Sequence, residues 1–343
     1  MAVVVGWDIG GAHLKAARAE NGRIVDAVQI AAPLRLGLDA LARAFAQAKP
    51  RMGTADQHVC TMTGELADTF ASRADGVEKL TAAAVRELGG VAIYAGRAGF
   101  VAPERAARHV EDIASANWHA TAALVAKRQR AALLIDMGST TTDIVPVASG
   151  AIAARAYTDA ERLAAGELVY TGLVRSFVMA VAERAPFAGA WTPLIHENFA
   201  TMADVHRLLG NLEEGADQMP TADGRGKTPQ ASRARLARMV GRDADVAEDY
   251  IALARWFAEA QIRTIVDAAM LVLSRGDLDA RAPIVAAGIG TKIIAEVARR
   301  LGRAHVRFET LLDVAAGARA QASHCAPAAA LALLACASEA ALP

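Results

Sequence analysis

The feature that most constrains how this chain folds is a short strand–loop–strand unit that occurs twice. An apolar run over residues 3–5 leads into Asp8 and Gly10, and an apolar run over residues 133–135 leads into Asp136 and Gly138. The two Asp-x-Gly motifs are offset by 128 residues, and a polar residue follows each aspartate after seven positions. This pattern predicts an internal duplication in which each copy opens one domain.

The length of the chain agrees with such a duplication. A chain of 343 residues is too long for one ordinary domain and suits two. We expect a first domain over residues 1–130 and a second over residues 131–325, with an insertion at about 190–245 where glycines and prolines collect. Residues 326–343 predict an Ala-rich C-terminal helix that packs back on the first domain.

Local patterns predict how each half is built. The first domain is expected to open as an antiparallel meander, because Asn21-Gly22 separates two strand-like runs and both residues tolerate a positive φ. In the second domain, apolar periodicity predicts a helix over about residues 160–183 and a long amphipathic helix over residues 246–274. The expected fold class is therefore α/β.

Composition excludes several classes of function. Lys plus Arg and Asp plus Glu each number 37, so the net charge is zero and there is no electrostatic footprint for nucleic acid or an anionic membrane. Cys60, Cys325 and Cys336 have no paired spacing, which argues against a disulfide framework. Without a signal peptide or a membrane-length apolar run, we expect a cytoplasmic protein that acts on small molecules, as a monomer or a homo-oligomer.

The first Asp-x-Gly turn has the residues of a phosphate site. Gly10 and Gly11 allow a ligand to approach the backbone, and the N–H groups of such a turn, with His13 beside them, form an anion site. Asp8, at the end of a strand, can hold a hydrated Mg²⁺. Lys15 can place a point charge on a phosphate, and we expect it in a hydrated cleft. The alternative is a plain hairpin with a glycine turn.

The second Asp-x-Gly turn repeats this chemistry with hydroxyl groups. Asp136 is the candidate metal ligand, and Asp143 is either a second metal-side carboxylate or a structural cap. Four consecutive Ser and Thr residues are also compatible with a plain strand. The phosphate-binding residues expected in this turn are Gly138, Ser139, Thr140 and Thr141.

Two further segments carry candidate phosphate ligands. Residues 284–292 predict a strand, a Gly-x-Gly turn and a helix start, where free N–H groups and the helix dipole favour anions. In residues 221–228, Arg225 and Lys227 belong either to a lid that closes over a diphosphate or to a solvated surface loop. The candidate ligands of the Gly-x-Gly segment are Gly288, Gly290, Thr291 and Lys292.

Together these turns resemble the layout of the actin–hexokinase–Hsp70 superfamily, in which two duplicated βββαβαβα, ribonuclease H-like domains flank a cleft. Three stretches narrow the resemblance: Thr-Gly-Glu-Leu at 63–66, Ala-Asn-Trp at 116–118 and Ala-Gly-Ile-Gly at 287–290. They are similar to the hydantoinase/oxoprolinase-like branch, and within it to proteins linked to the tetrahydromethanopterin one-carbon pathway. The resemblance spans nearly the full chain.

The resemblance also implies a reaction. This family includes a methanofuran-biosynthesis transferase that joins an (aminomethylfuranyl)methyl diphosphate to the phenol of a γ-glutamyl-tyramine or tyrosine-like partner, releasing diphosphate. Lys15 and Mg²⁺ are expected to stabilise the leaving diphosphate, and no organic cofactor is expected. A phenol needs a base at neutral pH, and Glu65 and Asp143 are both candidates.

Two other functions are compatible with the same loops. One is an ATP-dependent small-molecule kinase or amidohydrolase, in which residues 288–292 lie near the adenosine. The other is a nucleotide-binding protein without catalytic turnover.

Overall fold

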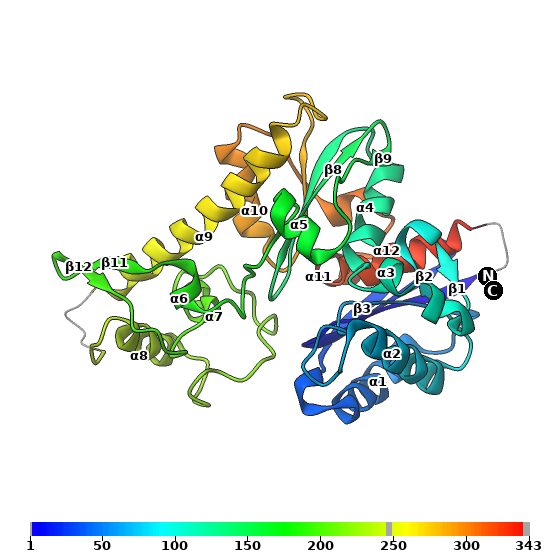
Figure 1. Ribbon diagram of the computed structural model, residues 1–343, viewed down its shortest axis with the longest axis horizontal. Helices are drawn as coiled ribbons and strands as arrows, with labels where there is room; N and C mark the ends of the chain where they lie inside the picture. Colours follow the sequence, from blue (N-terminus) through cyan, green and yellow to red (C-terminus); the bar gives the residue numbers. More distant parts are fainter. Residues whose placement is uncertain (1, 245–248, 339–343) are drawn as a thin grey trace. The chain divides into compact units, whose positions relative to one another are not determined.

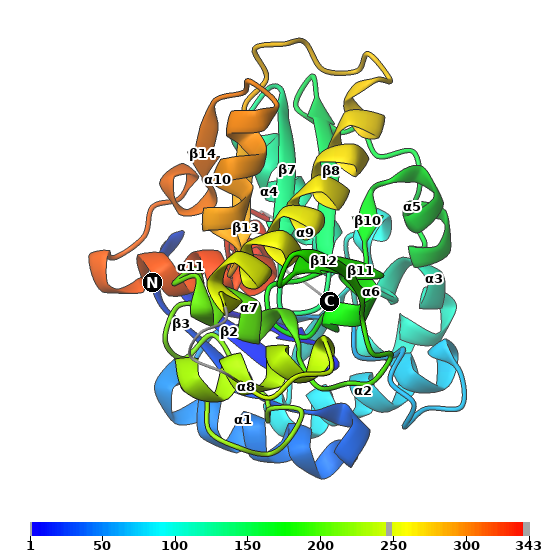
Figure 2. The same cartoon turned by 90° about the vertical axis from the view of Figure 1, so that its left-hand side faces the viewer.

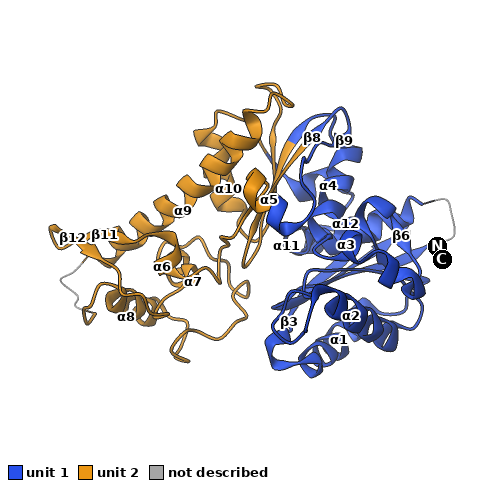
Figure 3. Ribbon diagram, viewed as in Figure 1, with its two compact units in different colours: residues 1–132, 147–161, 306–343 blue, residues 133–146, 162–305 orange. Residues whose placement is uncertain are grey.

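The computed structural model describes residues 2–244 and 249–338, which belong to two compact units (Figures 1 and 3). Unit 1 comprises residues 1–132, 147–161 and 306–343, and unit 2 comprises residues 133–146 and 162–305. No helix in the described part of the chain is long and apolar enough to cross a membrane.

Two segments that the sequence placed in the second domain cluster with unit 1. Residues 147–161 do so because β9 (Ala151–Ile152) contacts α4 (Asn117–Arg128). Residues 306–325 do so because α11 (Arg319–His324) contacts β3 (Arg23–Ala31).

The centre of unit 1 is a six-stranded mixed sheet with the order β3-β2-β1-β4-β5-β6. Its first three strands form the predicted antiparallel meander, and the β2–β3 turn has Asn21 at φ 51° and Gly22 at φ 78°, which confirms the Asn-Gly hairpin. β4 pairs in parallel with β1 and with β5. Besides β3, the strands of this sheet are β1 (Val3–Ile9), β2 (His13–Glu20), β4 (Gln57–Met62), β5 (Val91–Tyr94) and β6 (Phe100–Val101).

Helices cover both faces of this sheet (Figure 1). α1 (Leu38–Met52) and α2 (Arg73–Leu88) pack on one face, and α12 (Ala326–Cys336) packs on β1. A Cβ on Gly6 would lie 2.1 Å from Ala328 O, so α12 approaches the strand as closely as glycine permits. Residues 339–343 of the expected C-terminal helix lie outside the described residues.

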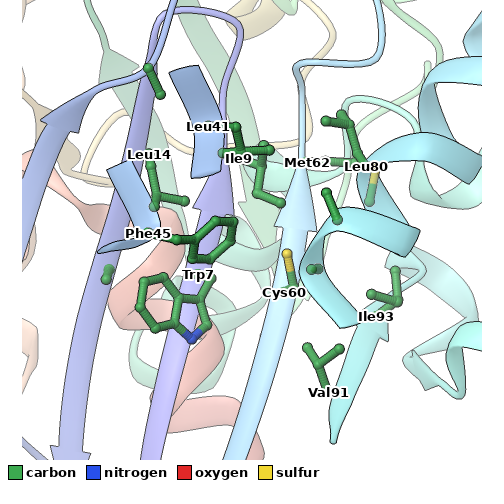
Figure 4. Packing of buried hydrophobic residues seen from close by; sticks show 14 of the residues in the cluster. Trp7, Ile9, Leu14, Leu41, Phe45, Cys60, Met62, Leu80, Val91 and Ile93 are labelled. Carbon is green, nitrogen blue, oxygen red and sulfur yellow. The ribbon is translucent and has the colours of Figure 1, made fainter. Parts of the chain in front are cut away.

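The opposite face of β1 carries the main hydrophobic core of unit 1 (Figure 4). Trp7 alternates with Gly6 along the strand and packs against Phe45 of α1, with ring centroids 5.2 Å apart. Cys60 and Met62 of β4 and Leu80 of α2 extend this cluster, in which all five side chains are fully buried.

Unit 2 repeats the topology of unit 1. Its sheet has the order β10-β8-β7-β13-β14, which matches β3-β2-β1-β4-β5 position by position, and β7 pairs in parallel with β13 as β1 does with β4. This correspondence confirms the predicted duplication. The strands are β7 (Ala132–Met137), β8 (Thr142–Ala148), β10 (Leu168–Val169), β13 (Ile284–Gly288) and β14 (His305–Arg307), and β9 pairs with β8 off this path.

The predicted helix over about residues 160–183 is wrong. The chain instead forms α5 (Asp159–Ala165), β10, a loop and α6 (Val178–Val181). Gly166, at φ 73°, ends α5, and the loop then packs against the second Asp-x-Gly turn. The predicted long helix is α9 (Tyr250–Leu273), and residues 246–248 lie outside the described part.

The insertion of unit 2 lies beside α9 (Figure 2). It has a hydrophobic core of its own. Phe187, Leu236 and Phe257 are buried in it, so the expected irregular segment is an ordered layer packed on the first half of α9. Its elements are β11 (Arg184–Phe187), β12 (Ala190–Pro193), α7 (Met202–Leu208) and α8 (Pro229–Met239). The remaining helices are α3 (Val110–Ile113), α10 (Thr291–Arg300) and short 3-10 turns at Leu34–Leu36, Gly96–Ala98, Pro103–Arg108, Phe308–Leu311 and Ala316–Ala318.

Candidate functional site

The first Asp-x-Gly turn is a tight hairpin between β1 and β2. The Gly10 N–H donates to His13 O at 2.9 Å, and a Cβ on Gly11 would meet no atom within 4 Å, so this backbone is open to a ligand. Asp8 and Lys15 face each other in the β1–β2 register, with Lys15 Nζ 3.7 Å from Asp8 Oδ2. His13 is buried at the start of β2.

The environment of Lys15 differs from the predicted hydrated cleft. Its side chain is only 20% exposed, and its ammonium lies beside Asp8, which is 1% exposed. Burying a lone carboxylate is unfavourable, so the pairing stabilises Asp8 in its charged form. Lys15 therefore has a structural partner in addition to any phosphate that it binds.

The second turn reproduces the hydrogen bond of the first. The Gly138 N–H donates to Thr141 O at 2.9 Å, at positions offset by the same 128 residues from Gly10 and His13. Ser139 Oγ is buried and makes no hydrogen bond within residues 2–244 and 249–338. The two turns therefore share a backbone geometry, as the duplicated motif predicts.

Arg175 lies beside the second turn, although no sequence motif indicated it as a site residue. Its side chain is exposed, Nη1 donates to Thr140 Oγ1 at 3.1 Å, and its backbone N–H donates to Ser139 O at 2.8 Å. The loop that carries Arg175 fits closely, because a Cβ on Gly172 would lie 2.5 Å from Thr140 N. Arg175 was not predicted as a site residue because residues 160–183 were predicted to form a helix. Gly172 is the residue in the sequence that could have indicated a loop there.

The Gly-x-Gly segment packs directly on the second turn. Gly288 has φ 82°, and a Cβ there would lie 2.4 Å from Asp136 Oδ1. A Cβ on Gly290 would lie 2.4 Å from the Met137 sulfur, and the Gly290 N–H donates to Met137 O at 3.0 Å. These glycines thus bring the start of α10, with Thr291 at its first position, next to the Asp136 strand.

Three of the predicted phosphate ligands, Lys292, Arg225 and Lys227, are near polar groups of the insertion. Lys292 is exposed, with Nζ 3.4 Å from Gly210 O. Lys227 Nζ lies 3.3 Å from Asp217 Oδ1, and Arg225, whose side chain is 69% exposed, lies 4.0 Å from Asp223. Within the described part of unit 2, no hydrogen bond or ion pair joins Arg225 or Lys227 to the second Asp-x-Gly turn.

Asp143 belongs to a structural ion pair. Its Oδ1 accepts a hydrogen bond from Arg162 Nη1 at 2.9 Å, and the Arg162 side chain is 1% exposed. Arg162 Nη2 also donates to Glu167 O at 2.8 Å. Asp143 compensates a buried guanidinium, and this function competes with accepting a proton from a substrate.

Glu65 has the surroundings of an acid–base residue. It is 1% exposed, Oε1 accepts a hydrogen bond from Ser115 Oγ at 2.9 Å, and Oε2 is buried without a hydrogen bond from any described residue. Burial raises the pKa of Glu65 from 4.5 to about 7, while the Ser115 hydrogen bond and the nearby Arg73 oppose that rise. A carboxyl group with a pKa near neutrality can both accept and return a proton at physiological pH.

The chain around Glu65 is held in place by its backbone. The N–H groups of Thr63 and Gly64 both donate to Ile9 O, at 2.9 and 3.0 Å, which joins this segment to the first Asp-x-Gly turn. On its other side, a Cβ on Gly76 of α2 would lie 2.6 Å from Glu65 O. Within unit 1, Glu65 is therefore positioned by the same strand that carries Asp8.

The carboxylates of the two Asp-x-Gly turns do not by themselves form a metal centre. In the described ranges, no group of three or more His, Cys, Asp or Glu side chains is placed to hold a metal ion. Asp8 already has an ammonium neighbour. Mg²⁺ usually retains waters and needs only one or two carboxylates plus phosphate oxygens, so a single carboxylate in each turn, Asp8 in unit 1 or Asp136 in unit 2, is chemically compatible with an ion that arrives with a phosphate ligand.

Comparison with known proteins places this chain in a family. The hydantoinase/oxoprolinase family model matches residues 56–334. The chain is 32% identical over 249 residues to the "(4-{4-[2-(gamma-L-glutamylamino)ethyl]phenoxymethyl}furan-2-yl)methanamine synthase" of Methanocaldococcus jannaschii, which covers 72% of this chain and 74% of that protein. It is 29% identical over 175 residues to the synthase of the same name from Methanococcus vannielii, covering 50% of this chain and 77% of that protein.

The fold has a counterpart among solved structures. A nucleotide-free acetone carboxylase structure covers 88% of this chain and 68% of its own, with a TM-score of 0.58 and 10% sequence identity. Together with the duplicated sheet order, this similarity confirms the expected actin/hexokinase-like α/β class. The chain belongs to the hydantoinase/oxoprolinase family.

Proposed function

We propose that this protein is a transferase that forms the aryl ether of a methanofuran-type cofactor precursor. The observation that carries the proposal is the 32% identity, over 72% of the chain, to a synthase whose name describes a phenoxymethylfuran product. We place the product in tetrahydromethanopterin-linked one-carbon metabolism. We place the reaction in the cytoplasm, a reducing compartment that suits the free thiols of Cys60, Cys325 and Cys336.

The reaction exchanges one carbon–oxygen bond for another. The bond between the furanylmethyl carbon and the diphosphate breaks, and the electron pair leaves with the diphosphate. The phenol oxygen of a γ-glutamyl-tyramine or tyrosine-like partner then bonds to the same carbon and loses its proton. Catalysis therefore requires a group that stabilises negative charge on the diphosphate and a base for the phenol.

The first turn supplies the charge-stabilising groups. The Lys15 ammonium and the open backbone at Gly11 offer donors to a phosphate oxygen. In unit 2, Ser139 Oγ and the exposed Arg175 guanidinium are further candidate phosphate ligands. Each turn has one carboxylate that would hold Mg²⁺, Asp8 in unit 1 and Asp136 in unit 2, and the ion would neutralise diphosphate charge.

We assign the base to Glu65 rather than to Asp143. Asp143 is paired with the buried Arg162, whereas Glu65 has one oxygen without a hydrogen bond from the described residues and a pKa raised by burial to about 7. The phenol proton would pass to Glu65 Oε2, and the Ser115 hydroxyl would hold Oε1 in place. A base with a pKa near the working pH is the efficient choice for a phenol.

A coupled assay tests this proposal. The protein is incubated with the furanylmethyl diphosphate, γ-glutamyl-tyramine and Mg²⁺, while diphosphate release is followed and the ether is identified by mass spectrometry. We expect one ether per diphosphate released. Diphosphate release without ether, or ATP hydrolysis stimulated by a small alcohol or amide, would contradict the proposal and favour a hydrolase or a kinase of this fold.

A further inference from the structure

While product occupies its Oε2 side, Glu65 has no direct path for a proton to bulk water. Its side chain is 1% exposed, so a proton accepted from a substrate leaves sooner through a neighbouring residue that reaches solvent than by waiting for the product to depart. A base that acts repeatedly must lose that proton after every turnover. The neighbouring polar groups in unit 1 therefore decide how quickly Glu65 becomes a base again.

Ser115 connects Glu65 to a more exposed carboxylate. The Ser115 hydroxyl lies 2.9 Å from Glu65 Oε1 and 3.0 Å from Asp159 Oδ2. It has one proton and can donate to only one of these oxygens at a time. Asp159 has 18% of its side chain exposed, and Arg73 Nη2 donates to the same Oδ2 at 2.6 Å.

The backbone at Ser115 supports a functional reading. Ser115 has φ 55°, a left-handed conformation that few non-glycine residues adopt. The residue is 7% exposed, and its hydroxyl is the group that touches both carboxylates. α2 holds the other members, because Arg73 begins this helix and Gly76 packs on the Glu65 backbone.

We propose that Ser115 and Asp159 form the route by which the proton leaves Glu65 after each turnover, an inference that rests on Glu65 being the base of the proposed reaction. A rotation of the protonated Glu65 carboxyl group first turns its O–H from the substrate side toward Ser115, and this proton passes to Ser115 Oγ as the hydroxyl proton of Ser115 passes to Asp159 Oδ2. Asp159 then releases its proton to water and returns to its ion pair with Arg73. The hydroxyl ends with one proton, as it began, and Glu65 ends ionised. Ser115 and Asp159 are positioning residues that act through Glu65.

Pre-steady-state kinetics separates this route from the chemical step. Ser115→Ala and Ser115→Gly both remove the hydroxyl, and glycine also relieves the φ 55° strain, so at least one variant keeps the fold. Above the acid limb of the pH–rate profile, where Glu65 is ionised in every variant, we expect the first turnover to stay within about twofold of wild type. The steady-state rate at the same pH should fall by on the order of 10-fold or more. Asp159→Asn should behave alike. The control is Asp26→Asn, which breaks the Arg51–Asp26 ion pair, also in unit 1.

Two further readouts make the result decisive. The Ser115 hydrogen bond lowers the Glu65 pKa, so the acid limb of the pH–rate profile should move to higher pH in Ser115→Ala. An equal loss in the first turnover and in the steady state, or no loss in either, would overturn the exit route. If no variant and no wild-type protein forms the ether, the proposed function fails. In that case the route can still be tested by hydrogen–deuterium exchange of the Glu65 carboxyl group, which is identified in infrared difference spectra between wild type and Glu65→Gln. The exchange should be slower in Ser115→Ala than in wild type, and an unchanged exchange rate would overturn the route.

Discussion

At the scale of single residues, two carboxylates have opposite effects on stability: Glu65 is buried itself, and Asp143 is half-buried but pairs with a buried arginine. Glu65 is held among groups that leave its charge poorly compensated, so burial raises its pKa to about 7. Asp143 instead neutralises Arg162, whose side chain is 1% exposed. Removing the charge should therefore stabilise the fold at Glu65 and destabilise it at Asp143.

For Glu65→Gln we expect lower activity with higher stability. The folded-state pKa lies above the unfolded value, so the native state binds more protons between about pH 4.5 and 7, and wild-type stability falls as pH rises through this range. Above pH 7 the variant should be more stable by on the order of 2 to 3 kcal/mol, and below pH 4.5 the difference should vanish. Denaturant titrations at pH 4 and pH 8 measure this. Equal stabilities at pH 8 would show that Glu65 is not raised in pKa.

Asp143→Asn is the matched contrast. Asparagine still accepts one hydrogen bond from Arg162 but leaves its buried charge uncompensated. We expect a loss of about 2 to 3 kcal/mol of unfolding free energy, at or below the lower end of the usual range for a broken buried pair. Any remaining folded enzyme should keep its pH–rate profile. A shifted acid limb would instead return Asp143 to the candidates for the base.

We expect Lys15 to contribute both to stability and to the proposed chemistry. Lys15→Ala should lower kcat on the order of 10²-fold, because a charge-stabilising donor is lost, and should also lower Tm, because Asp8 is left buried without its ammonium. The double variant Lys15→Ala with Asp8→Asn should recover Tm but not kcat. Recovery of both in an ether-formation assay would remove Lys15 from the site.

At the scale of elements, α9 supports the loop that covers the second turn. Gln261 Nε2 donates to Thr171 Oγ1 at 2.7 Å and to Gly172 O at 2.9 Å, and Gln261 Oε1 lies 2.8 Å from His206 Nε2. Burial lowers the pKa of His206 to about 4, so this contact is between neutral groups near pH 7. A helix and an insertion thereby set the position of Arg175.

Gly172→Ala tests this support. The new Cβ would lie 2.5 Å from Thr140 N, so the backbone must shift, and we expect a loss of about 1 to 3 kcal/mol together with weaker diphosphate binding. Gly226→Ala is the control, since a Cβ there meets no atom within 4 Å and its φ is not in the left-handed region. Thermal melts and calorimetric titration with Mg²⁺ and diphosphate measure both effects. An unchanged Tm and an unchanged diphosphate affinity in Gly172→Ala would argue against tight packing of the Gly172 loop on the second Asp-x-Gly turn.

At the scale of the whole molecule, the duplicated sheet gives each unit an Asp-x-Gly turn with the same backbone hydrogen bond. A ligand that binds the native state raises its stability by RT ln(1 + [L]/Kd), about 2.7 kcal/mol at ~100-fold excess over Kd. We expect Mg²⁺ with diphosphate to raise Tm more than Mg²⁺ with ATP at equal concentration. A larger shift with ATP would favour the nucleotide-binding alternatives.

The sequence by itself determined the features that depend on neighbouring residues. Asn21-Gly22 specifies its hairpin because both residues accept a positive φ, and the two Asp-x-Gly turns close with the same hydrogen bond because their glycines occupy equivalent positions. The resemblance carried by these motifs led to the correct fold class and family. Apolar periodicity failed over residues 160–183, where a glycine loop is stabilised by contacts with another part of unit 2.

The proposed choice of Glu65 over Asp143 as the base rests on tertiary structure alone. Ser115 lies 50 residues from Glu65 along the chain and 44 residues from Asp159, so no local pattern indicates that the three side chains meet. Burial and partner charge control a carboxyl pKa, and both arise from long-range packing. For the same reason, Arg175 became a candidate ligand only when the loop placed it 35 residues away in sequence from Thr140 and within hydrogen-bond distance of its hydroxyl.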